Sequence, residues 1–154
     1  MKKPWIGRWW FLLLAFALAP AVAEKASEAP LEAPLYVADV TLQSAEELTT
    51  LLERAETLLL EGARPPSGSE PRVSFVLHGP VLEHLVRDAY LDNKQLVDQA
   101  AAMSALEFIE IKACRTWIRT NGLTPEEFHP FLDMVELGAI EVTDLVENKG
   151  RIYF

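Results

Sequence analysis

The apolar positions of this chain follow two periods along the sequence, one that predicts helices and one that predicts strands. The clearest helical pattern begins with Ser44 and Glu47, a capping-box pair three residues apart, and ends at Gly62. Its apolar residues recur with the spacing of one helix face: Leu48, Leu51, Leu52, Ala55, Leu58 and Leu59. Other helices are predicted after Gly79-Pro80, after Asn93, over 115–121, from a capping box at 124–127 and over 139–146.

Five segments rich in β-branched, aromatic and other apolar residues predict strands. They are residues 35–42, 72–78, 107–114, 134–137 and 151–154. Because helices alternate with these segments, right-handed crossovers should place the strands in one mostly parallel sheet with helices on both faces. We therefore expect an α/β fold, a small flavodoxin-like three-layer sandwich with a five-stranded, mostly parallel sheet.

The third predicted strand carries an unusual polar face. Phe108, Glu110, Lys112 and Cys114 alternate with apolar residues, so they should lie on one side of the sheet. A strand that is covered on both faces is normally almost wholly apolar. We therefore expect this face to be partly open or covered by another subunit, and the protein to be a homo-oligomer.

The N-terminal segment has the pattern of an export signal. Three basic residues among the first eight precede an unbroken apolar run over 9–19, and the small-x-small sequence AVA follows at 21–23. The alternative is a membrane anchor, but a span needs about 20 apolar residues, and Pro20 and Glu24 end this run earlier. We predict a signal peptide over 1–23, a periplasmic or secreted location, and no stable membrane span after cleavage.

The rest of the composition narrows the function classes. The chain has 154 residues, a net charge of −9, one cysteine and three histidines. An acidic chain is a poor match for nucleic acid, one cysteine forms no internal disulfide, and no Cys/His spacing fits a metal site. The sequence contains no nucleotide-binding glycine motif and no Cys-x-x-Cys motif, so we expect no cofactor. An Ala/Glu/Pro-rich lead-in over 24–34 should precede a single domain over 35–154.

Cys114 is the first candidate for chemistry. It ends a predicted strand and precedes a predicted helix, at the edge where open α/β sheets bind ligands. The positive end of that helix, Lys112 on the same strand face and the adjacent Arg115 would all favour the thiolate. The alternative is a buried structural cysteine, because free cysteines are among the most buried residues.

Polar residues at two other strand ends are further candidates. His78 ends the second predicted strand, just before Gly79-Pro80, and could act as a base or orient a ligand. Asp39, near the end of the first predicted strand, could border the same site. Both side chains could instead bond to loop backbone. The other histidines, His84 and His129, are expected on helix surfaces.

Four short motifs follow one another along the chain. They are His-Gly-Pro at 78–80, Lys-Ala-Cys at 112–114, Gly-Leu-Thr-Pro at 122–125 and Gly-Ala-Ile-Glu-Val at 138–142. In this order the chain resembles the DsrE/DsrF-like sulfur-relay family over about 120 residues. The resemblance implies a parallel five-stranded sheet with the strand order 2-1-3-4-5, homo-oligomers, and a persulfide on the strand-end cysteine, here Cys114.

These observations lead to two hypotheses. The first is an exported DsrE/DsrF-like protein that binds or relays sulfur on Cys114, at most a sulfur carrier or transferase, with a sulfur donor or acceptor protein as partner. The second is a non-catalytic homo-oligomeric binding module with an inert cysteine. If the first strand lay between the second and third, the axes of those two would be about 9.6 Å apart. A direct Cys114–His78 hydrogen bond is therefore not expected.

Overall fold

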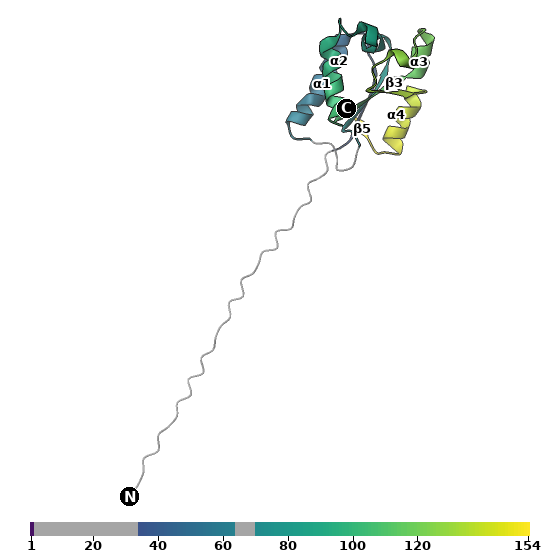
Figure 1. Cartoon of the computed structure of the whole chain (residues 1–154). Coiled ribbons are helices and arrows are strands. Elements are labelled where there is room, and N and C mark those ends of the chain that lie inside the picture. Colours follow the sequence, from purple (N-terminus) through teal and green to yellow (C-terminus); the bar gives the residue numbers. More distant parts are fainter. Residues whose placement is uncertain (2–33, 64–69) are drawn as a thin grey trace. The chain divides into compact units, whose positions relative to one another are not determined.

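The computed structural model describes Met1, residues 34–63 and residues 70–154 (Figure 1). Apart from Met1 and Pro34, the predicted signal peptide over 1–23 and the lead-in over 24–34 lie outside these residues. In the described part of the chain, no helix combines the length and apolar character that a membrane crossing requires.

A sheet of five strands forms the centre of the fold, and its neighbouring strands all pair in parallel. The strands are β1 (Tyr36–Thr41), β2 (Val73–His78), β3 (Ile109–Cys114), β4 (Leu132–Val135) and β5 (Ile152–Tyr153). Their order across the sheet is β4-β3-β2-β1-β5. The expected α/β fold with a five-stranded parallel sheet is therefore confirmed.

Helices cover both faces of this sheet, as Figure 1 shows. They are α1 (Ala45–Leu60), α2 (Lys94–Ala105), α3 (Arg115–Thr120) and α4 (Gly138–Glu147). On one face, the buried sides of α1 and α2 share a large core with the strands. On the other face, Val142 and Leu145 of α4 pack against Val37 and Val76. These three layers match the predicted sandwich.

The strand order 2-1-3-4-5 implied by the family resemblance is wrong for this chain. The reason lies in the positions of α1 and α2, which pack on the same face of the sheet. Successive right-handed crossovers over one face move the chain across the sheet in one direction. Strands β1, β2, β3 and β4 are therefore consecutive neighbours, and only the crossover through α4 returns to place β5 beside β1.

Two predicted helices are shorter than expected. The segment after Gly79 forms two 3₁₀ helices, η1 (Pro80–Leu85) and η2 (Arg87–Ala89), and the capping box at Thr124 begins only the 3₁₀ helix η3 (Pro125–Glu127). Extended residues end both η1 and η3, because Val86 and Phe128 pair with each other in an isolated antiparallel bridge. A local sequence pattern cannot predict this pairing, because its two residues are far apart in the chain.

Further differences concern the beginning of β3 and the position of His129. Strand β3 begins at Ile109, and Phe108 does not share a face with Glu110, because Glu107 has a φ of 55° that turns the chain just before the strand. Phe108 is consequently buried in the core on the α1 and α2 side. His129 lies in a partly buried loop rather than on a helix surface, with its ring stacked on that of Phe131.

Candidate functional site

Cys114 and His78 end neighbouring strands on the same face of the sheet. Leu77 of β2 pairs with Ala113 of β3, so the residues that follow them lie side by side at the carboxyl edge. Neighbouring strands are about 4.8 Å apart, half the separation expected from the family's strand order. The strand-order argument against a direct Cys114–His78 hydrogen bond therefore does not apply, because β1 does not lie between the two strands. Within the described residues, however, His78 bonds to Asp39 and makes no hydrogen bond with Cys114.

Asp39 completes a row of three residues across β3, β2 and β1. Its Oδ1 lies 3.1 Å from Nε2 of His78. The two side chains are 42% and 22% exposed, respectively, so water reaches this pair. When Nε2 carries the ring proton it donates to the carboxylate, which fixes the ring orientation and leaves Nδ1 as the proton acceptor. Such an arrangement suits a general base.

Two glycines shape the backbone around His78. Gly79 has a φ of 83°, a backbone conformation that favours glycine. A Cβ there would also be in tight contact, 3.1 Å from both Leu42 O and Thr41 Cγ2. Gly138 is the first residue of α4, and a Cβ on it would lie 2.0 Å from Cε1 of His78. The helix thus begins in direct contact with the imidazole ring. Gly138 was not singled out from the sequence as a site residue, although a glycine immediately before the predicted helix over 139–146 was a visible signal.

Cys114 is a free thiol that is almost fully covered. Its residue is only 3% exposed, and it lies at the junction of β3 and α3. On the other side of β3 it pairs in register with Val135 of β4. A reagent must therefore be small, or the segment around the thiol must open, before Cys114 can react in the folded protein.

The two cations expected to act on the thiol are held by carboxylates. Nζ of Lys112 lies 2.8 Å from Oε1 of Glu141 and 3.5 Å from Oε2 of Glu110. Nη1 of Arg115 lies 3.1 Å from Oε1 of Glu136. Both positive charges are therefore largely neutralised by partners other than Cys114.

The environment of Lys112 keeps its ammonium group charged. Burial is the largest single effect and lowers the pKa of Lys112. The hydrogen bond with Glu141 and the negative charges of Glu110, Glu141 and Asp133 outweigh it, and together they raise the pKa of Lys112 above its usual value. Lys112 is consequently a fixed counter-ion for these carboxylates.

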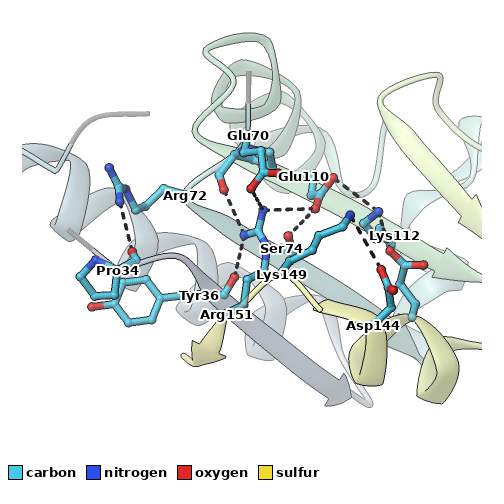
Figure 2. A network of polar contacts seen from close by, with 12 residues as sticks. Pro34, Tyr36, Glu70, Arg72, Ser74, Glu110, Lys112, Asp144, Lys149 and Arg151 are labelled. Carbon is cyan, nitrogen blue, oxygen red and sulfur yellow. Dashed lines mark hydrogen bonds and ion pairs between the residues drawn. The ribbon is translucent and has the colours of Figure 1, made fainter. Parts of the chain in front are cut away.

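A network of polar contacts continues from Lys112 toward the other end of the strands (Figure 2). Glu110 accepts a hydrogen bond from Ser74 and lies 3.9 Å from Nη2 of Arg151. Arg151 is 3% exposed, and its Nη1 donates to the carbonyls of Tyr36 and Pro71, each at 3.0 Å. The guanidinium thus ties β1, β3 and the segment before β2 together.

This network corrects the expectation of an open polar face on β3. Glu110 and Lys112 are partly buried, and their partners come from α4 and the C-terminal segment of the same chain. A monomer therefore satisfies the polar face without a second subunit. Self-association stays a prediction, but this face no longer supports it.

Comparisons with known proteins support the fold and are silent on activity. No family model matches the chain, and no curated protein matches it. Among solved structures, the chain is similar to a protein of unknown function from Methanobacterium thermoautotrophicum. The two are 14% identical with a TM-score of 0.57, and the match covers 77% of this chain and 97% of that one. At this level of identity the likeness shows the α/β fold alone.

Proposed function

We propose that this chain is an exported DsrE/DsrF-like protein that binds or relays sulfur as a persulfide on Cys114. The observation that best supports the proposal is the row formed by Cys114, His78 and Asp39 at the carboxyl edge of three neighbouring strands. A thiol, a histidine beside it and a carboxylate that orients the histidine are the groups that an activated sulfur nucleophile needs.

The proposed step is an exchange between sulfur atoms. Nδ1 of His78 takes the proton of the Cys114 thiol, and the thiolate attacks the outer sulfur of a donor persulfide or polysulfide. The new S–S bond forms on Cys114 as the donor S–S bond breaks, and the donor leaves as a thiolate. No net oxidation or reduction occurs, so the step requires no oxidant and no cofactor. Transfer to an acceptor thiol is the same exchange with Cys114 as the leaving sulfur.

Mass spectrometry of the folded protein after incubation with inorganic polysulfide tests this proposal. Because the chain has one cysteine, a gain of one sulfur atom can be assigned to Cys114. Cys114→Ser should abolish the gain, and His78→Gln should slow it by roughly 10²-fold, the lower range for loss of a general base. His84→Gln, a change at a histidine of η1 outside the row, is the matched control and should react like the unchanged protein.

The alternative is a binding module in which Cys114 is structural. The burial of Cys114, only 3% exposed, is the observation that favours it. The uptake of sulfur by Cys114 in the folded protein distinguishes the two functions, because a structural thiol should take up sulfur only after denaturation. If polysulfide modifies Cys114 in urea and leaves it unmodified in buffer, the sulfur-relay proposal gives way to the binding module.

A further inference from the structure

Two arginines of α3 hold one carboxylate between them. Nη1 of Arg115 lies 3.1 Å from Oε1 of Glu136, and Nη1 of Arg119 lies 3.2 Å from Oε2 of the same residue. The arginines are four residues apart, which places them on one side of the helix. The hydroxyl of Thr116, between them in the sequence, donates to the Glu136 carbonyl at 2.8 Å. This geometry is that of an occupied carboxylate-binding site.

The arginine pair lies next to the candidate site. Arg115 directly follows Cys114, and Glu136 directly follows Val135, the residue that pairs with Cys114 across the sheet. Two residues further on, Gly138 contacts the ring of His78. The segment 136–138 therefore runs from the arginine pair to the imidazole ring.

The carboxylate of Glu136 is a replaceable occupant of this pair. The side chains of Arg119 and Glu136 are 60% and 66% exposed, and water and salt weaken ion pairs at such positions. In addition, Nε of Arg115 is buried and has no hydrogen-bond partner within the described residues. Glu136 thus leaves this buried N–H of Arg115 without an acceptor.

We propose that Arg115 and Arg119 form a subsite for the negatively charged end of the sulfur donor, and that Glu136 occupies this subsite until the donor displaces it. The donor class is then a small anionic persulfide or polysulfide. The identity of the donor rests on the proposed function, whereas the anion subsite beside the thiol does not.

Alkylation of Cys114 by a matched pair of reagents tests the subsite. Iodoacetate and iodoacetamide are nearly equal in size, and only iodoacetate is an anion, so the ratio of their rates measures anion preference at the thiol. Glu136→Gln should raise this ratio by roughly two- to fivefold, the Boltzmann factor of one exposed ion pair. Arg119→Gln should lower it by a similar factor. Asp98→Asn, which removes a carboxylate from the exposed Lys94–Asp98 pair of α2, should leave it unchanged.

Competition separates a subsite from a general effect of charge. In the Glu136→Gln protein, propionate should slow the iodoacetate reaction in a saturable way and leave the iodoacetamide reaction unaffected. A rate ratio that is the same in the unchanged protein, Glu136→Gln and Arg119→Gln would overturn the subsite. The subsite would also be overturned if neither reagent alkylated Cys114 in the folded state of any variant. A subsite that passes these tests in a protein that takes up no sulfur from polysulfide would refute the proposed function alone.

Discussion

The contact between Gly138 and His78 makes Gly138→Ala the most informative single substitution. The new Cβ would lie 2.0 Å from Cε1 and 2.5 Å from Nε2 of the ring, whereas carbon atoms in contact are about 3.5–4.0 Å apart. The ring or the start of α4 must therefore move by about 1.5 Å or more. A displaced ring loses its bond with Asp39, and a displaced helix loosens the packing of Val142 and Leu145. Because Gly138 is not a positive-φ residue, its backbone itself accepts alanine.

We expect Gly138→Ala to lower the free energy of unfolding by about 1–3 kcal/mol, the usual cost of overpacking. Urea unfolding measures this change, and the NMR signals of His78 show whether the ring has moved. In a His78→Ala background the clash is gone, and alanine should be neutral or favourable by up to about 1 kcal/mol, because alanine is the better helix former. The double-mutant cycle thus isolates the contact. An equal effect of Gly138→Ala in both backgrounds would refute the close approach of α4 to His78.

Two further predictions concern pH and export. Burial, followed by the positive charge of Arg87, lowers the pKa of His129, so the folded protein binds this proton less readily than the unfolded chain. The contribution to stability should be complete above the unfolded pKa of about 6.5 and should fall as the pH drops below it. Urea midpoints across this range measure the loss, and His129→Leu should reduce the loss whereas His84→Gln should not. N-terminal sequencing of exported protein should find Glu24 first, and an intact Met1 in the membrane fraction would indicate an anchor instead.

The sequence predicted the elements of the fold better than their arrangement. Periodicity located the five strands and four α-helices of the described residues, because burial of one helix face or one strand face leaves a local pattern. The bounds were less accurate: β4 spans Leu132–Val135, two residues earlier than the predicted 134–137. Strand order leaves no such pattern, since α1 would show the same apolar stripe on either face of the sheet. The lengths of η1 and η3 depend on the bridge between Val86 and Phe128, which are far apart in sequence. The strand order and the lengths of these two 3₁₀ helices could therefore be determined only from the tertiary structure.

The candidate site was predicted in part for the same reason. Strand ends identified Cys114 and His78, because the carboxyl edge of a parallel sheet follows from the element order. Their adjacency depends on strand order, so it could not be predicted. The charges of Lys112 and Arg115 were visible, but their carboxylate partners, Glu141 and Glu136, come from segments more than 20 residues away.

The polar face of the sheet explains why the candidate site lies at the carboxyl ends of the strands. Near the amino ends of the strands, Glu110 is held by Ser74 and Arg151, and further along β3, Lys112 is held by Glu141 of α4. These charged groups are partly buried and pair with each other within the chain. The pairing stabilises the packing of α4, and it leaves few free charged groups that could bind a ligand. At the carboxyl ends the same face carries the partly exposed His78–Asp39 pair and a thiol beside it. Polar residues on a buried sheet face therefore divide into a structural network and a candidate site according to their position along the strands.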